Sequence, residues 1–257
     1  MFNPRIAAAA RTAVAGVCIS VAAVSVASGC RPATSATPAA APSPTAAGTN
    51  LNESPTPVAT TSPTTSSGVY GDPAAAAKFW QVQSLEDNCG LMSVADVVGE
   101  LTGHAPTEEH MVTLAEKTPS GTNPGPIYAP RNDPSHAGNN GGIEMADEVV
   151  LLDHYGIKSA MTYAGDNKRL GLPTLEQYLG NDRKIIAWVN SAIIWNTSDQ
   201  RTKADHFLVV TGIDTNKEIV HLNDPGADHA DEQVAVATFT NAWHTGEESI
   251  VVTAATG

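Results

Sequence analysis

Residues 83–103 read QSLEDNCGLMSVADVVGELTG, and the architecture of the chain can be built outward from this stretch. After Cys89, apolar side chains recur at the spacing of one helix face until Gly103 ends the pattern. Asn88 is a favourable N-cap residue, so the sequence predicts a helix with Cys89 in its first turn. There the unpaired backbone N–H groups and the helix dipole favour a thiolate over a thiol. The apolar positions are Leu91, Met92, Val94, Val97, Val98 and Leu101.

Residues 1–30 have the pattern of an export signal. They contain two arginines, no acidic residue and an apolar run over 12–27 that is too short for a membrane-spanning helix. The run ends in Ala27-Ser28-Gly29-Cys30, which resembles a bacterial lipobox. We therefore expect Cys30 to carry a lipid and the mature protein to lie outside the cytoplasmic membrane of a bacterial cell envelope. Because leucine is more usual than Ala27 in that pattern, plain cleavage and secretion is the alternative.

The cysteine count narrows the kinds of site that the chain can hold. Cys18 leaves with the signal segment and Cys30 is consumed by the lipid, so Cys89 remains as the single free thiol. This excludes a disulfide framework and a four-cysteine zinc site, and we expect neither a metal nor a cofactor. A bridge between Cys30 and Cys89 is the alternative if Cys30 is not lipidated.

The rest of the chain divides into a linker and one domain. Residues 31–68 are a low-complexity stretch of Pro, Ala, Ser and Thr, for which we expect a disordered tether. Residues 69–257 number 189, enough for one domain with a sizeable core. This domain carries 26 of the 27 acidic and 11 of the 14 basic residues, a net charge of −15. Such a charge disfavours nucleic acid and anionic lipid as surface partners, so only the N-terminal lipid should touch a membrane. The oligomeric state is not predicted.

Predicted helices come first along the domain and predicted strands follow, which is typical of an α+β fold. A long irregular stretch over 118–142 is expected to form a wall or lid of a substrate groove, or to be an insertion without a role. In the first case Tyr128 and the turn at 139–142 would contact substrate. Besides the helix after Asn88, helices are predicted at 108–117, 143–155 and 173–179, strands at 158–163, 184–189, 205–213, 218–223 and 249–253, and one helical turn at 239–243.

The two strands at 205–213 and 218–223 are expected to form a hairpin that joins a histidine to a carboxylate. His206 opens the first strand and Asp224 follows the second, so a turn at 214–217 brings them to about 5 Å. His206 would then take the Cys89 proton, while Asp224 orients the imidazole. Asp205 is the rival carboxylate, but the residue next to His206 points to the other face of the strand.

Gln83 lies just before the predicted helix and is the expected oxyanion donor. Its side-chain amide would act together with the backbone N–H of Cys89, and Gln81 is the competing candidate.

Other histidines offer a metal-binding alternative. A zinc site could combine His206, His221 and Asp224, but neighbouring strand residues alternate faces and no metal-ligand spacing recurs. We therefore predict no metal, and place His221, His229 and His244 at the surface.

Three motifs together resemble those of papain-like cysteine peptidases of the bacteriocin-leader-processing type, the C39-like peptidases. They are QSLEDNCG at 83–90, HFLVVTGID at 206–214 and HLNDPG at 221–226, and the likeness spans nearly all of 79–253. It departs at 90–92, where members often have CGP or CGxA. The chain also shows no transporter domain, so cleavage of double-glycine leaders during export is not expected.

This resemblance implies a papain-like α+β fold, with N-terminal helices and a helix-start nucleophile packed on an antiparallel sheet. For 69–257 it implies thiol-dependent cleavage of peptide or protein substrates, with Cys89 as nucleophile, His206 as base, Asp224 as orienting carboxylate and Gln83 in the oxyanion hole. One alternative is a murein endopeptidase or amidase of the NlpC type, which usually begins Asp-Cys-Ser-Gly and lacks the upstream Gln. Another is a non-catalytic binding lipoprotein, which has no physical reason to keep all four residues.

Overall fold

A computed structural model describes residues 68–130, 133, 142–164 and 170–255 of the chain. The expected signal segment with Cys30, the linker up to residue 67 and the turn residues 139–141 lie outside the described residues. Within the described ranges, every helix is too short or too polar to cross a membrane.

The described part of the chain combines helices with one seven-stranded sheet in which every pairing is antiparallel. The helices are α1 (Pro73–Ala76), the 3-10 helix η1 (Ala77–Phe79), α2 (Cys89–Thr102), α3 (Glu108–Lys117), α4 (Met145–His154), α5 (Leu172–Gly180), α6 (Ser191–Ile194) and α7 (Val236–His244). The strands are β1 (Val69–Gly71), β2 (Ser159–Thr162), β3 (Ile185–Val189), β4 (His206–Asp214), β5 (Ile219–Asn223), β6 (Glu232–Ala235) and β7 (Ile250–Thr253). The expected α+β class is confirmed.

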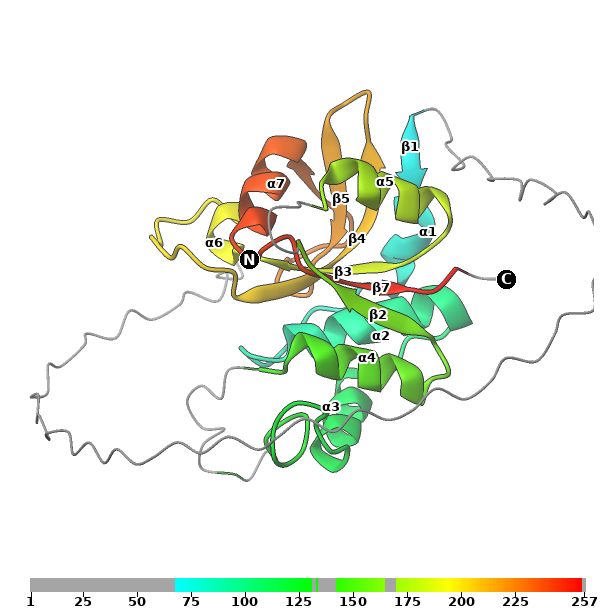
Figure 1. Cartoon of the computed structure of the whole chain (residues 1–257), viewed down its shortest axis with the longest axis vertical. Helices are drawn as coiled ribbons and strands as arrows, with labels where there is room; N and C mark the ends of the chain where they lie inside the picture. The colour runs from blue at the N-terminus through cyan, green and yellow to red at the C-terminus, as the bar shows by residue number, and fades with distance from the viewer. Residues whose placement is uncertain (1–67, 131–132, 134–141, 165–169, 256–257) are drawn as a thin grey trace, which may run out of the picture. The chain divides into compact units, whose positions relative to one another are not determined.

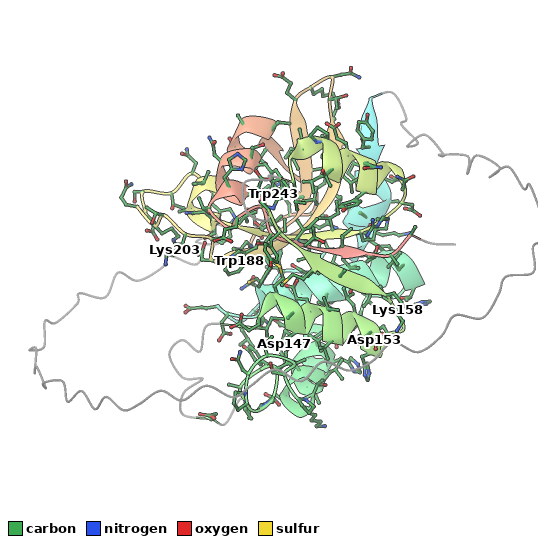
Figure 2. The ribbon with its side chains drawn as sticks, viewed as in Figure 1. Asp147, Asp153, Lys158, Trp188, Lys203 and Trp243 are labelled. Atoms are coloured by element: carbon green, nitrogen blue, oxygen red, sulfur yellow. The ribbon has the colours of Figure 1, made fainter. Side chains whose placement is uncertain are left out.

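The sheet lies between two layers of helices. Its strand order is β2-β7-β3-β4-β5-β6, with β1 beside β4, and Figure 1 shows α2, α3 and α4 on one face and α5 and α7 on the other. Central strand β3 is buried on both faces, because Ile186 packs into the α2–α4 core and Ile185 into the α5–α7 core. In Figure 2, Asp147 and Trp243 accordingly lie on opposite sides of the sheet. This double burial explains why the strand is apolar without alternation.

Helix α2 forms as predicted. It begins at Cys89 and ends at Thr102, and the C-cap Gly103 follows with a φ of 82°, the left-handed conformation that glycine tolerates best. Every residue from Cys89 to Gly99 is buried, the polar Ser93 and Asp96 included, so the helix is covered on all sides and not only along the predicted apolar stripe. Its apolar side chains pack against β4 and the neighbouring helices. The candidate nucleophile Cys89 is therefore the first residue of a helix that the core holds firmly.

Several short elements were not predicted. β1, β6, α1 and α6 have three or four residues each, and the expected single turn at 239–243 is the nine-residue helix α7. The burial pattern of β6 is only partial, so its apolar signal is weak and its pairing with β5 holds it in the sheet. Elements of this length depend on a neighbour more than on their own sequence.

Candidate active site

Cys89 is the first residue of α2 and is 8 % exposed. Asn88 occupies the N-cap position as predicted, but its side chain makes no capping hydrogen bond. Its Nδ2 instead donates to Glu108 Oε1 at 2.7 Å. Cys89 is the free cysteine of the described residues, and it lies in the first turn of the helix, where backbone N–H groups have no intrahelical partner.

His206 and Asp224 form a buried pair next to this helix start. His206 Nε2 lies 2.6 Å from Asp224 Oδ1, and the two residues are 4 % and 0 % exposed. Trp195 Nε1 donates to the second carboxylate oxygen at 2.8 Å, and the backbone N–H of Gly226 donates to the first at 2.7 Å. The Trp195 ring also meets the His206 ring edge-on, with centroids 5.0 Å apart. Asp224 is thus held by three donors and holds the imidazole in one orientation.

The electrostatics of the pair follow from these contacts. Burial alone would lower the pKa of His206, but the Asp224 carboxylate and then Cys89 outweigh it and raise that pKa to about 10. Burial would raise the pKa of Asp224, yet the His206 charge and the hydrogen bonds from His206, Trp195 and Gly226 bring it below its ordinary value. A hydrogen bond to Cys89 is among the causes that act on His206. Because Asp224 engages Nε2, Nδ1 is the ring nitrogen left for the thiol.

The hairpin register differs in detail from the expectation. β4 and β5 pair Val209 with Asn223 and Gly212 with His221, and a bulge lies between Val210 and Gly212. The last β4–β5 pair therefore comes before Asp224, and His206 pairs with Val189 of β3 instead. The closeness of His206 and Asp224 was correctly predicted, but it arises because Asp224 lies just past the strand end and not opposite His206 in the ladder.

Gln83 is buried beside the turn that carries Asp224. Its backbone N–H donates to Pro225 O at 2.9 Å and its side-chain Nε2 donates to Leu85 O at 2.7 Å. One of the two amide hydrogens is thus used inside its own loop. The side chain of the competing Gln81 donates to Pro106 O at 2.9 Å, toward the start of α3.

The rival residues are engaged elsewhere. Asp205 accepts hydrogen bonds from the backbone N–H and the hydroxyl of Ser191, both at 2.9 Å, and pairs with Arg201. His221 was expected at the surface, which is wrong: it is 8 % exposed, and its Nδ1 lies 2.7 Å from Asp231 Oδ1. The strand pairing on both sides of β5 covers His221.

Among the described residues, no group of three or more His, Cys, Asp or Glu could hold a metal ion.

Tyr128 does not line a groove as expected. It is fully buried, and its hydroxyl donates to Asp87 Oδ1 at 2.5 Å. This contact ties the described part of the 118–142 stretch to the loop that leads into Cys89. The same stretch is fastened to α4, because Ser120 Oγ and the Gly121 N–H donate to Asp147. The described part of this stretch therefore holds the loop before Cys89 and contacts α4.

Sequence reasoning missed several residues that build the site. Trp195 was not singled out because no local pattern links it to Asp224, 29 positions away. Trp80 Nε1 donates to the backbone O of Asp224 at 2.6 Å and was missed for the same reason. Gly226 had a signal, since it ends the Asn-Asp-Pro-Gly turn. A Cβ atom there would lie 2.5 Å from Trp195 Cζ2.

A helix-start thiol next to a buried histidine–carboxylate pair on an antiparallel sheet is the arrangement expected of papain-like enzymes. The chain belongs to the Peptidase_C39 like family, whose model matches residues 79–249.

Two uncharacterized mycobacterial proteins are relatives of the chain. They are Rv1268c of Mycobacterium tuberculosis and Mb1299c of Mycobacterium bovis, each 41 % identical over 196 residues, which cover 72 % of this chain and 84 % of the relative. Solved structures with a similar course of the chain are a candidate C39-like peptidase from Bacillus anthracis and the peptidase domain of Streptococcus ComA. The first is 18 % identical with a TM-score of 0.48, covering 70 % of this chain and 95 % of that one. The second is 17 % identical with a TM-score of 0.44, covering 69 % and 98 %.

Proposed function

We propose that the domain is a cysteine peptidase that hydrolyses peptide bonds in peptide or protein substrates. The observation that carries the proposal is the 2.6 Å contact between His206 and Asp224 beside Cys89 at the start of α2. Membership of the Peptidase_C39 like family supports the peptide bond as the target.

Each residue has a role that its surroundings suit. The Cys89 thiolate attacks the carbonyl carbon and forms a C–S bond, while the negative charge passes to the carbonyl oxygen. The Cys89 backbone N–H and the second amide hydrogen of Gln83 are the proposed donors to that oxygen. His206 then protonates the leaving amine as the C–N bond breaks, which leaves a thioester. Water activated by His206 hydrolyses the thioester and releases the acid and the thiol.

Asp224 keeps the imidazole correctly turned and stabilises its charged form. Trp195 and Gly226 donate two further hydrogen bonds to the carboxylate, which favours its ionised state. Because the pKa of His206 is raised to about 10, the imidazolium that protonates the leaving amine persists to high pH. We expect peptide cleavage to decline as the pH rises through about 10, when that proton is lost.

A peptide electrophile that reacts with thiols tests the proposal on the purified chain, with modification of Cys89 followed by mass spectrometry. We expect Cys89 to react far faster than free cysteine near neutral pH, and His206→Ala to slow it by about 100-fold or more. Asp224→Asn should also slow it, whereas the matched Asp205→Asn, whose carboxylate binds Ser191 and Arg201, should stay within about threefold. A wild-type rate equal to that of free cysteine, unchanged by His206→Ala, refutes the proposal.

The same preparation separates peptide substrates from murein. We expect cleavage of a peptide library and no release of fragments from purified peptidoglycan. Release of murein fragments without peptide cleavage would instead assign the chain to the cell-wall hydrolases.

We also propose that the enzyme works outside the cytoplasmic membrane, anchored by a lipid on Cys30. The proposal rests on the apolar run and lipobox-like end of residues 1–30 and on the low-complexity stretch that follows. Membrane fractionation of cells that carry the wild type or Cys30→Ser tests it.

A further inference from the structure

Glu148 on α4 is a buried carboxyl group that the proposed mechanism leaves unused. It is 0 % exposed, and neither of its carboxyl oxygens has a hydrogen-bond partner in the described part of the chain. The adjacent Asp147 is 1 % exposed but accepts hydrogen bonds from Ser120 Oγ at 2.8 Å and Gly121 N at 2.9 Å. One turn of α4 therefore carries two buried acids, of which one is satisfied and the other is not. Such an orphan group calls for an explanation, because it costs stability.

The orphan carboxyl lies against the residue that follows Cys89. A Cβ atom on Gly90 would be 3.0 Å from Glu148 Oε1 and 2.8 Å from Ile143 Cγ1. Any larger residue at position 90 would collide with Ile143 and Glu148. Glycine after Cys89 therefore allows the Glu148 carboxyl group of α4 to lie against the first turn of α2. This turn is where the unpaired N–H groups of the helix and the Cys89 thiol meet.

The charges around the pair decide the form in which Glu148 exists. Burial, and after it the charge of Cys89, raises the pKa of Glu148 well above its ordinary value, which favours the neutral acid over the carboxylate. On α4, the Asp147 carboxylate accepts hydrogen bonds from the turn at 120–121. From β4, His206 faces Cys89, and Asp224, which follows the end of β5, faces His206. The coupling is reciprocal: a thiolate favours the neutral acid, and the neutral acid favours the thiolate.

We propose that Glu148 is a positioning residue that, as an uncharged carboxylic acid, stabilises the Cys89 thiolate. Its O–H has no acceptor among the described groups, and negative charge on Cys89 supplies one. A carboxylic acid that an apolar site keeps neutral can serve as a donor to an anion in this way, and donors to charged acceptors bind more strongly than donors to neutral ones. The inference rests on the proposed role of Cys89 as nucleophile.

The test is the pH dependence of Cys89 alkylation by iodoacetamide in the full chain, followed at Cys89 by mass spectrometry. Glu148→Met keeps the length of the side chain and removes its polar atoms, and should move the alkylation midpoint upward by about one pH unit. At a pH below both midpoints, a shift of one pH unit lowers the rate of Cys89 alkylation roughly tenfold. Glu148→Gln keeps the shape and a donor and should stay close to the wild type. Asp147→Asn, a matched change of a buried acid on the same helix turn, should leave the midpoint in place.

Stability separates this role from a structural one. Because Glu148→Met removes an orphan polar group, its melting temperature should equal or exceed that of the wild type while its alkylation midpoint rises. Coincident midpoints for the wild type and Glu148→Met, with an activated wild-type thiol, overturn the role of Glu148 alone. A wild-type Cys89 that alkylates like free cysteine overturns this role and the proposed function together.

A second measurement needs no change at position 148. The carboxyl ¹³C signal of Glu148 should titrate at lower pH in Cys89→Ser than in the wild type, because the thiolate charge is gone. Titration at the same pH in both proteins overturns the coupling, even if the Glu148→Met variant does not fold.

Discussion

At the scale of single residues, buried carboxyl groups near the site are held in contrasting ways. Asp224 has three donors and a lowered pKa. Asp96 on α2 accepts one hydrogen bond, from Asn223 Nδ2 at 2.9 Å, and burial followed by the Glu100 charge raises its pKa well above the ordinary value. Asn223 directly precedes Asp224, so Asp96 links α2 to the strand end that carries the proposed orienting carboxylate. Both acids are buried, so the opposite directions of their pKa shifts follow from the hydrogen-bond donors and the neighbouring charges.

The raised pKa of Asp96 makes a prediction about stability. A group whose pKa is higher in the folded state stabilises fully below its unfolded pKa, near pH 4, and this contribution is lost as the pH rises through the folded pKa. Asp96→Asn keeps an acceptor for Asn223 and removes the ionisation. We expect the variant to match the wild type at pH 4 and to exceed its free energy of unfolding by about 1 kcal/mol at pH 8.5 in urea titrations.

The control is Asp153→Asn, which changes an exposed acid that pairs with Lys158 at the surface (Figure 2). It should stay within about 0.5 kcal/mol of the wild type at both pH values. If the free energy of unfolding of the wild type instead rises relative to that of Asp96→Asn as the pH increases, the pKa of Asp96 is not raised and the prediction is wrong.

At the scale of elements, α3 fixes the loop that leads into α2. Glu108, its first residue, accepts hydrogen bonds from Ser84 N at 2.6 Å, Ser84 Oγ at 2.7 Å and Asn88 Nδ2 at 2.7 Å. Burial would raise the pKa of Glu108, but these hydrogen bonds outweigh it and lower that pKa. One carboxylate thereby holds the residue after Gln83 and the residue before Cys89. We infer that Glu108 sets the distance between the proposed oxyanion donor and the nucleophile.

Replacement of Glu108 by Gln should disturb catalysis more than stability. The amide nitrogen of Gln would face donors of Ser84 or Asn88, so the loop loosens and kcat/KM for a peptide substrate should fall about tenfold or more. The free energy of unfolding should fall by about 1–2 kcal/mol, measured in urea. The effect belongs mainly to kcat, because the loop positions reacting groups.

Glu109→Gln is the matched control, since the neighbouring side chain is exposed and the change in charge is the same. It should alter kcat/KM by less than about twofold. Equal losses in Glu108→Gln and Glu109→Gln would trace the effect to helix charge and not to the clamp on the loop.

At the scale of the whole molecule, the sequence places a proposed export signal and a proposed tether before an acidic domain. The domain has a net charge of −15, so its surface should be repelled by anionic lipid. We therefore propose that any attachment to the membrane comes from the N-terminal segment. A tether of the length and composition of 31–68 would let the domain work at a distance from the bilayer.

The proposed anchor predicts where the protein is found. We expect the full chain in the membrane fraction, resistant to high salt and released by detergent, because a lipid and not charge holds it. Cys30→Ser should leave the membrane fraction, whereas Cys18→Ser, which changes the other N-terminal thiol, should remain in it. Recovery of wild type and Cys30→Ser in the same soluble fraction would favour plain secretion.

Most of the local structure near the site could be predicted from local pattern. The apolar periodicity and Gly103 defined α2 with Cys89 at its start, and two apolar runs around a polar turn defined the hairpin that brings His206 to Asp224. These features depend on neighbours within a few positions, so their signals lie in contiguous sequence. The short strands β1 and β6 carried no such signal because pairing with another strand, and not their own composition, holds them in place.

The contacts that tune the site could not be predicted, because they join segments that are far apart in the chain. Trp195 reaches Asp224, Glu108 reaches Ser84 and Asn88, and the register of β4 and β5 shifts at a bulge. The sequence was thus sufficient to place the chemical groups on their elements, through periodicity and turns. Packing of those elements settled which acids have a raised pKa and which a lowered one, because burial and the number of donors arise only when the helices close on the sheet.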